Sequence, residues 1–416
     1  MDLRTTPPNS QESLKTQASS HLAEQIGIVT ATRVVMHTEH RIVYPFLNLF
    51  ARGLGVSLEQ LSMAITARSM MGFLGPFLAH IADRYGRKIS MLLGLGMLIL
   101  ACLVIWIFPT FPVFFVALMV AMLGILMFIP AMQAFISDRT PYEKRGRMLG
   151  LTELSWAGSF VIGIPFIGWL MSHAEEAKAW RVPFPVIALF GSLMLILIAW
   201  RIPNNRSLTP VEGNGVGTLR KVLGVSSVLA ALGFAISISA ANEVVNLVFG
   251  VWLEDRFALK LAALGAASAV IGISEMGGEG LSALLSDRLG KEVAITIGLI
   301  VSALATLMLY FFSSTIVGAL TGLFFFYLGF EFTLVSSLPL ISEIYPGARA
   351  TVMALSNAGA SLGRALGAFL SPRLYDIDFV VNLIVSIALV VLGYVLLKHI
   401  HPAKPESLSP AGIETP

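Results

Sequence analysis

The sequence contains little charge and almost no cysteine. Charged residues make up 13% of its 416 residues, whereas a soluble domain carries roughly 25%. Its one cysteine, Cys102, excludes an intrachain disulfide framework and a cysteine metal site. The sequence also lacks a Walker motif, a metal-ligand spacing and a nucleophile–base set. We therefore expect no enzyme activity, cofactor, bound metal or nucleic-acid partner.

Hydrophobic residues make up 56% of the chain, and the mean hydropathy is +0.80. A helix needs roughly 20 apolar residues to cross a bilayer. By this measure the sequence predicts an all-α, polytopic membrane protein with twelve transmembrane helices in two pseudo-symmetric six-helix halves. The predicted spans are 25–51, 58–82, 88–108, 111–137, 146–172, 183–201, 223–252, 260–285, 291–312, 315–343, 349–373 and 377–399.

The placement of Lys and Arg predicts the orientation. With both termini on the cytoplasmic side, eighteen of these residues lie inside and six outside, as the positive-inside rule requires. We expect a multi-pass protein of the inner or plasma membrane. Its predicted parts are a disordered cytoplasmic tail (1–22), an N-terminal half (23–202), a polar linker (203–222), a C-terminal half (223–400) and a second tail (401–416).

Two polar loops indicate an internal duplication. The first, Asp83-Arg84-Tyr85-Gly86-Arg87-Lys88, follows the second predicted helix, and its glycine permits a tight reversal. The second, Ser286-Asp287-Arg288-Leu289-Gly290-Lys291, holds the same place in the other half. The loops after helices 4 and 10 also match, Ile136–Pro141 with Ile341–Pro346, and Arg145 then corresponds to Arg349. Two signatures in the same order favour a repeat.

These motifs make the chain resemble the major facilitator superfamily over all twelve helices. The segment Ala79–Lys88 is similar to that family's motif A, with Ala79 in place of the leading glycine. The resemblance implies a conformational latch in which Asp83 caps the start of helix 11, Arg84 pairs with Asp138, and Arg288 pairs with Glu343. The alternative is a solvated basic loop. The predicted latch residues are Asp83, Arg84, Gly86, Arg87, Asp138, Arg145, Asp287, Arg288, Glu343 and Arg349.

Helix 5 contains Gly158–Gly168, which loosely resembles the family's Gly/Pro-rich antiporter motif. Packing of small residues between helices explains it more simply. The arginine typical of helix 4 in drug/proton antiporters is absent, since 111–135 contains neither Arg nor Lys. Any coupling to protons must therefore use other groups.

Ionisable groups at membrane depth are costly, so each is a candidate site. On helix 1, the helical period places Arg33, His37, His40 and Tyr44 on one face, with Arg41 beside them. This stripe should line a cavity and either bind an anionic or acceptor-rich group or carry protons. The alternative is an internal charge network, for example Arg33 or Arg68 with Glu39.

Further polar groups lie on other helices. Asn242, Glu243 and Asn246 suggest a wet wall on helix 7. Glu275 and Glu279 share a face of helix 8; close carboxylates are costly to ionise together, so one could carry a proton, unless one pairs with Arg364. The predicted substrate and proton pathway comprises Arg33, His37, His40, Arg41, Glu153, Asn242, Glu243, Asn246, Glu275, Glu279, Glu331 and Arg364.

The sequence thus predicts a monomeric secondary transporter that works by alternating access. Our first expectation is proton-coupled export of a small amphiphilic organic compound. Uptake or facilitated transport of an organic anion, selected by Arg33 and Arg41, is the alternative. A non-transporting receptor would need a large soluble domain, which the sequence lacks.

Overall fold

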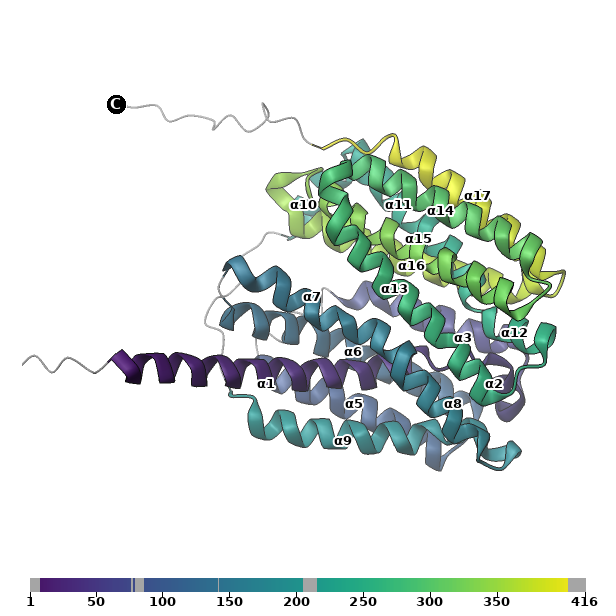
Figure 1. Ribbon diagram of the computed structural model, residues 1–416, viewed down its shortest axis with the longest axis horizontal. Coiled ribbons are helices and arrows are strands. Elements are labelled where there is room, and N and C mark those ends of the chain that lie inside the picture. Colours follow the sequence, from purple (N-terminus) through teal and green to yellow (C-terminus); the bar gives the residue numbers. More distant parts are fainter. Residues whose placement is uncertain (1–7, 76–77, 79–85, 141, 205–214, 403–416) are drawn as a thin grey trace, which may run out of the picture. The chain divides into compact units, whose positions relative to one another are not determined.

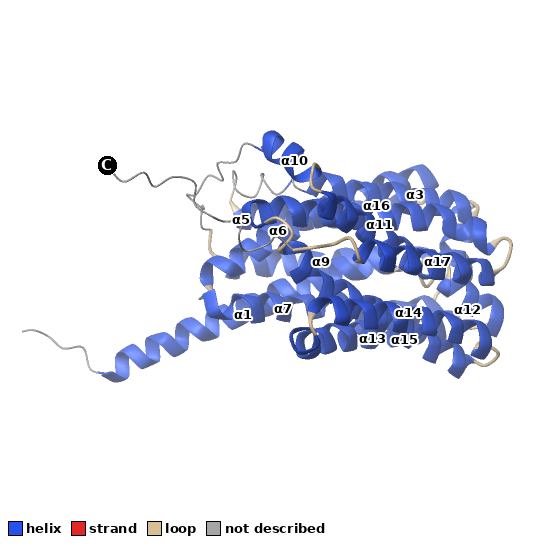
Figure 2. Ribbon diagram, turned by 90° about the horizontal axis from the view of Figure 1, so that it is seen from above, coloured by secondary structure: helices blue, strands red, loops and turns tan. Residues whose placement is uncertain are grey.

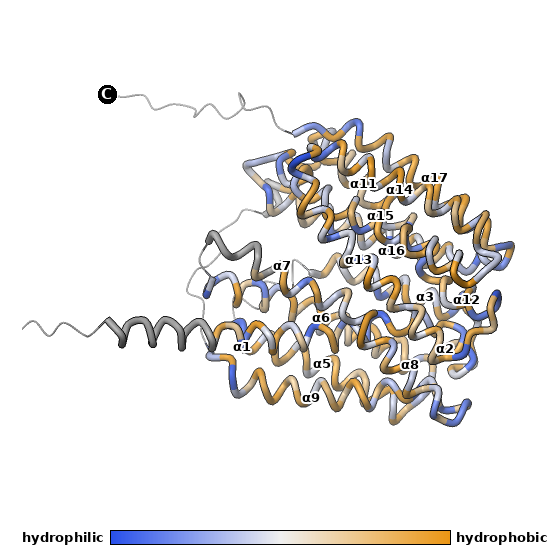
Figure 3. The backbone as a smooth tube through the Cα atoms, in the orientation of Figure 1, coloured by the Kyte–Doolittle hydropathy of each residue, from blue (hydrophilic) through white to orange (hydrophobic). Residues whose placement is uncertain are grey.

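The computed structural model describes residues 8–75, 78, 86–140, 142–204 and 215–402. Within these residues every regular element is helical, and no strand is present (Figure 2). Apolar residues dominate the middle of the helices, whereas hydrophilic residues lie mostly near their ends (Figure 3). This distribution fits helices that cross a bilayer.

The helices form two compact units, one of 1–43 and 74–210 and the other of 44–73 and 211–416. The segment Tyr44–Phe73 therefore packs with the C-terminal helices, although it lies within the predicted N-terminal half. Its α3 packs along α16 of the second unit.

The first unit contains six of the predicted spans or parts of them. Its helix α5 packs against both α6 and α9, and these helices are drawn in blue and teal in Figure 1. Its elements are α1 (Pro8–Arg41), α5 (Arg87–Ile107), α6 (Phe111–Arg139), α7 (Tyr142–Gly158), the π-helical turn η2 (Ser159–Gly163), α8 (Ile164–Ser172), η3 (Glu176–Arg181) and α9 (Pro183–Arg201).

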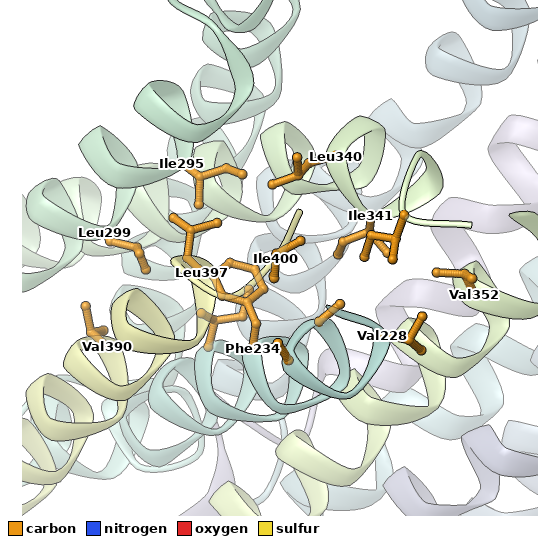
Figure 4. Packing of buried hydrophobic residues seen from close by; sticks show 14 of the residues in the cluster. Val228, Phe234, Ile295, Leu299, Leu340, Ile341, Val352, Val390, Leu397 and Ile400 are labelled. Atoms are coloured by element: carbon orange, nitrogen blue, oxygen red, sulfur yellow. The ribbon is translucent and has the colours of Figure 1, made fainter. Parts of the chain in front are cut away.

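The second unit holds the remaining elements. They are α2 (Leu47–Leu54), α3 (Leu58–Met70), η1 (Met71–Leu74), α10 (Gly215–Leu223), α11 (Ser226–Asn246), α12 (Phe249–Phe257), α13 (Leu261–Leu289), α14 (Lys291–Phe312), α15 (Ile316–Ser342), η4 (Pro346–Ala348), α16 (Arg349–Tyr375) and α17 (Phe379–Leu397). Figure 4 shows the apolar core of this unit, where Phe234 of α11, Leu299 of α14, Ile341 of α15 and Leu397 of α17 meet.

Nine helical stretches of the described residues are long and apolar enough to cross a membrane. The other three predicted spans are helical in part or throughout but carry more charge or extend beyond the described residues. They correspond to α1, to α3 with η1, and to α16, which carries Arg349, Arg364 and Arg373.

Helices 1 and 7 are each broken, which the sequence analysis did not predict. The break in helix 1 separates α1 from α2 at 42–46 and contains Pro45, which lacks a backbone donor. The break in helix 7 separates α11 from α12 at 247–248. Two further helical segments were not predicted, since α1 begins at Pro8 within the expected tail and α10 lies in the expected linker.

Close glycine contacts repeat in both units and support the duplication. A Cβ on Gly94 of α5 would lie 2.4 Å from the carbonyl oxygen of Gly124 on α6. At the equivalent place, a Cβ on Gly329 of α15 would lie 3.0 Å from the carbonyl oxygen of Gly298 on α14. The absence of side chains lets the backbones of each pair approach closely.

Candidate functional site

A buried ion pair joins α1 to α7 in the first unit. Both terminal nitrogens of Arg33 lie 2.9 Å from the two carboxylate oxygens of Glu153, and Arg33 also donates to the Thr152 hydroxyl at 3.1 Å. The Arg33 side chain is 4% exposed, whereas that of Glu153 is 41% exposed. The partner of Arg33 is therefore Glu153, and the suggested pair with Glu39 is wrong.

The other polar residues of helix 1 gather around Trp156 of α7. The guanidinium of Arg41 lies between two rings, 4.2 Å from the centre of Trp156 and 3.6 Å from that of Phe160. It also donates to the Trp156 carbonyl at 3.1 Å. His37 meets the same indole edge-on at 4.9 Å, and His40 lies 6.3 Å from it. Arg33, His37, His40 and Arg41 therefore share one environment.

His37 differs from its neighbours because it is buried without hydrogen bonds. Neither ring nitrogen has a hydrogen-bond partner among the described residues, and the residue is 3% exposed. The indole of Trp156 is only partly buried. His37 and Trp156 together form an aromatic surface, and the ring nitrogens of His37 are buried at its edge.

The local fold of helix 5 sets the position of these groups. The π-helical turn η2 directly follows α7, and such turns are frequent at functional sites. Gly163 within it lets α1 approach, because a Cβ there would lie 2.0 Å from the Thr38 hydroxyl. This contact confirms close packing at a small residue in the Gly158–Gly168 segment.

Tyr44, the last residue of the predicted stripe, contacts a residue of the second unit. It follows the end of α1 and belongs to the second unit, where its hydroxyl accepts a hydrogen bond from Arg68 at 3.2 Å. Arg68 is 1% exposed and is among the largest fully buried side chains. Because α1 ends at Arg41, the helical period on which the stripe prediction rests does not extend to Tyr44.

Glu243 of α11 lies at the centre of the second polar cluster. It is 1% exposed, and one of its oxygens accepts from the Asn246 amide at 3.1 Å. The charges of Arg68 and Arg364 and the hydroxyl of Tyr44 act on the same carboxylate. A buried carboxylate requires such compensation, since it has lost its hydration.

The cluster extends to α15 and α16. Tyr327 of α15 donates to the Asn246 amide oxygen at 2.8 Å. Arg364 of α16 is solvent-exposed and donates to Ser361 at 3.2 Å. The charge of Glu243 also acts on Arg364, and the suggested pairing of Arg364 with Glu275 or Glu279 stays a prediction.

The remaining predicted pathway residues of the second unit lie elsewhere. Asn242 faces a small cavity lined by Phe326 and Ser302 rather than the Glu243 cluster. Glu275 and Glu331 are buried, and Glu279 is half-buried. A Cβ on Gly278 of α13 would lie 2.8 Å from the Cβ of Glu331, so Glu331 is at the α13–α15 interface.

The two latch loops contain equivalent ion pairs. Arg87 binds the Asp138 carboxylate in the first unit, and Lys291 lies 2.5 Å from Glu343 in the second. Gly86 and Gly290 precede these cations with φ of 96° and 85°, a conformation that favours glycine. The predicted pair of Arg288 with Glu343 is wrong, because Lys291 is the residue that binds this acid.

Other latch predictions are only partly described. Asp83 and Arg84 lie outside the described residues, as does the side chain of Arg145. Asp287, Arg288 and Arg349 are exposed. Arg349 is the first residue of α16.

Sequence reasoning overlooked Trp156. The signal was available, because Trp156 follows Glu153 by three residues and therefore shares its helix face. No group of three or more His, Cys, Asp or Glu residues in the described part of the chain could hold a metal ion.

Comparison with known proteins identifies the family. Residues 29–368 match the model of the Major Facilitator Superfamily. An uncharacterized MFS-type transporter of Bacillus subtilis, YceJ, is 25% identical over 85% of this chain and 89% of its own length. Multidrug resistance protein 1 of the same organism is 24% identical over 73% of this chain and 77% of its own length.

A solved structure shows the same fold. A mutant form of the nucleoside transporter NupG superposes with a TM-score of 0.78 at 11% identity, over 91% of this chain and all of its own. The helical architecture, the duplicated loops and the family match agree. The chain therefore belongs to the major facilitator superfamily and is a multi-pass membrane transporter, not an enzyme.

Proposed function

We propose that this secondary transporter exports a small amphiphilic organic compound in exchange for protons. The observation that carries the proposal is the position of Glu243. This carboxylate is buried and hydrogen-bonded to Asn246. The charges of the buried Arg68 and the exposed Arg364 both act on it.

Such a carboxylate has two states: it is either ionised and compensated by the nearby guanidinium groups, or protonated and neutral. When Glu243 is ionised, the two guanidinium groups compensate its charge. When it is protonated, the cluster gains one positive charge, and repulsion between Arg68 and Arg364 is no longer offset. Protonation at this position therefore changes the forces between helices 2, 7 and 11, which is what coupling to a conformational change requires.

The environment of Trp156 favours an aromatic or apolar substrate group. Its partly exposed indole offers a large apolar face. Arg33 is neutralised by Glu153, and Arg41 is held between Trp156 and Phe160. Arg33 and Arg41, on which organic-anion transport would depend, therefore already have interaction partners within the protein.

The relatives support export only weakly. One of those described above is named a multidrug resistance protein, at 24% identity. The exposed Arg364 keeps the anion alternative open, because an anionic substrate could bind there. We further propose a monomer in the cell membrane with both termini cytoplasmic, as the distribution of Lys and Arg favours.

The proposal predicts that Glu243→Gln abolishes the response of transport to a pH gradient. Purified protein would be reconstituted in liposomes, and movement of a fluorescent amphiphilic dye would be followed with and without an imposed gradient. We expect the gradient to drive transport in the wild type, and the variant to lose at least about tenfold of this driven rate. Transport down a dye gradient should persist in the variant.

Glu175→Gln is the matched control, since Glu175 is an exposed acid outside both clusters. A wild-type rate that ignores the pH gradient would overturn proton coupling. A driven rate that survives Glu243→Gln would show that another group carries the proton. Stimulation by a gradient of an organic anion, but not of the dye, would favour the alternative function.

A further inference from the structure

The side chain of Asn246 connects the buried acid Glu243 to a neighbouring helix. Asn246 is the last residue of α11, and the helix is broken directly after it, at 247–248. It follows Glu243 by three residues, so the two side chains lie on the same face of the helix. The Asn246 amide nitrogen donates to a Glu243 carboxylate oxygen at 3.1 Å, and its amide oxygen accepts from the Tyr327 hydroxyl at 2.8 Å. One amide therefore bridges Glu243 and α15.

Tyr327 determines which way round this amide lies. An asparagine amide carries a donor at one end and an acceptor at the other, and the two ends have nearly the same shape. The Tyr327 hydroxyl donates to the oxygen end, so the nitrogen end faces Glu243. Tyr327 is 1% exposed, and its ring meets Phe249, the first residue of α12, edge-on at 6.5 Å. Tyr327 thus contacts the chain on both sides of the break in helix 7.

The orientation of the Asn246 amide favours the ionised form of Glu243. An ionised carboxylate only accepts hydrogen bonds, whereas a protonated one also has a hydrogen to donate. The amide nitrogen of Asn246 is a donor and cannot accept that hydrogen. A hydrogen bond to the ionised form stabilises this form against protonation. The end of the amide that faces Glu243 therefore influences how readily the acid binds a proton.

The other groups around Glu243 do not reverse their hydrogen bonding in this way. The two arginines act through their charge and stay protonated at any ordinary pH. The side chains of α17 that contact α11 do not titrate. The groups that act on Glu243 or contact this part of α11 from other elements are Arg68 of α3, Arg364 of α16, Tyr44, Tyr327 of α15, and Asn382 and Ser386 of α17.

We propose that Asn246, oriented by Tyr327, sets the pH at which Glu243 binds its proton. The inference rests on the proposed role of Glu243 as the proton carrier. Asn246 and Tyr327 are positioning residues, since neither carries the proton. When α15 moves away from α11, the amide can turn, and its oxygen can then accept from protonated Glu243. Proton binding is thereby linked to the packing of α15 on α11.

Infrared spectroscopy of the full-length protein in detergent tests this assignment. The band of protonated carboxyl groups is followed against pH, and the contribution of Glu243 is the part that Glu243→Gln removes. Asn246→Leu removes the donor to the ionised form at nearly constant volume. The protonated form should then persist to higher pH, with the midpoint raised by about one pH unit, as for the loss of one hydrogen bond to a charged group.

Tyr327→Phe removes a single hydroxyl and keeps the test decisive if Asn246→Leu does not fold. The midpoint should rise by a smaller amount, because the amide is still present but is no longer oriented. Once Asn246→Leu has removed the amide, adding Tyr327→Phe should shift the midpoint no further, whereas an independent effect of Tyr327 would add in full. Tyr310→Phe is the matched control, since Tyr310 of α14 is 53% exposed, and it should leave the midpoint unchanged.

Single variants that unfold at the wild-type temperature but titrate like the wild type would contradict the inference. Shifts that add in the double variant, or a midpoint that falls, would contradict it equally. If wild-type transport still responds to a pH gradient in that case, the proposed function stands without this inference. A wild-type protein in which Glu243 contributes no protonated band at any pH would instead refute Glu243 as the proton carrier.

Discussion

The Arg33–Glu153 pair is the contact whose loss has the clearest physical consequence. Arg33 is almost fully buried, so removal of Glu153 leaves a charge without compensation. Breaking a buried pair costs about 3–5 kcal/mol. We expect a smaller coupling free energy of about 1–3 kcal/mol, because water reaches Glu153. A double-mutant cycle with Arg33→Gln and Glu153→Gln, followed by thermal unfolding, measures it.

The exposed pair of Lys178 and Glu175 provides the comparison. Their side chains are 65% and 66% exposed, and exposed pairs contribute only about 0.2–1 kcal/mol. The same cycle at this pair should give a clearly smaller coupling. Equal coupling at the two pairs would show that burial of Arg33 does not matter.

At the residue scale, the sequence identified most of the charged residues of the candidate site but not the residues with which they interact. Charged residues inside apolar segments are visible in any sequence, which is why Arg33, Glu243 and Arg364 could be named. Their partners depend on packing between distant helices. The helical period could not place Tyr44, because the break before Pro45 ended the helix.

The element that depends most on close packing is helix 5. A Cβ at Gly163 would lie only 2.0 Å from the Thr38 hydroxyl. We therefore expect Gly163→Ala to destabilise the protein by about 1–3 kcal/mol, as overpacking commonly does. The midpoint of thermal unfolding should fall, and Thr38→Ala should restore part of the loss.

Gly96 of α5 is the matched control, because a Cβ there would meet no atom within 4 Å. Gly96→Ala removes conformational freedom from the unfolded chain and should leave stability unchanged or slightly raised. A similar loss of stability in both variants would indicate a general intolerance of alanine rather than a clash with α1.

At the scale of the whole molecule, the duplication predicts equivalent roles for Arg87 and Lys291. Each follows a glycine with positive φ and binds the acid that ends helix 4 or helix 10. We expect Arg87→Ala and Lys291→Ala to slow transport by similar factors while leaving substrate affinity almost unchanged. Initial rates across a range of dye concentrations in liposomes measure both quantities.

Lys291→Arg is the conservative control, since Arg occupies the equivalent place in the first unit. It should transport at close to the wild-type rate. A large loss of affinity in either alanine variant would place that loop in the substrate site and contradict a purely conformational role.

The twelve spans and the repeat could be predicted because hydropathy and turn residues report them directly. The grouping of the helices into the two compact units could not be predicted from the sequence. Nothing in the local sequence of 44–73 shows that this segment packs with the C-terminal helices, because the contacts of α3 with α16 join residues almost three hundred positions apart.

That grouping makes the chain pass between the two units three times, near residues 43, 73 and 210. The first two crossings coincide with interruptions of regular helix, the turn at 42–46 and the 3₁₀ segment η1. Any motion of one unit against the other must be absorbed at these crossings, and an interrupted helix bends more readily than a continuous one. We therefore expect the interruption at 42–46 and the segment η1 to bend more than the continuous helices whenever the protein changes conformation.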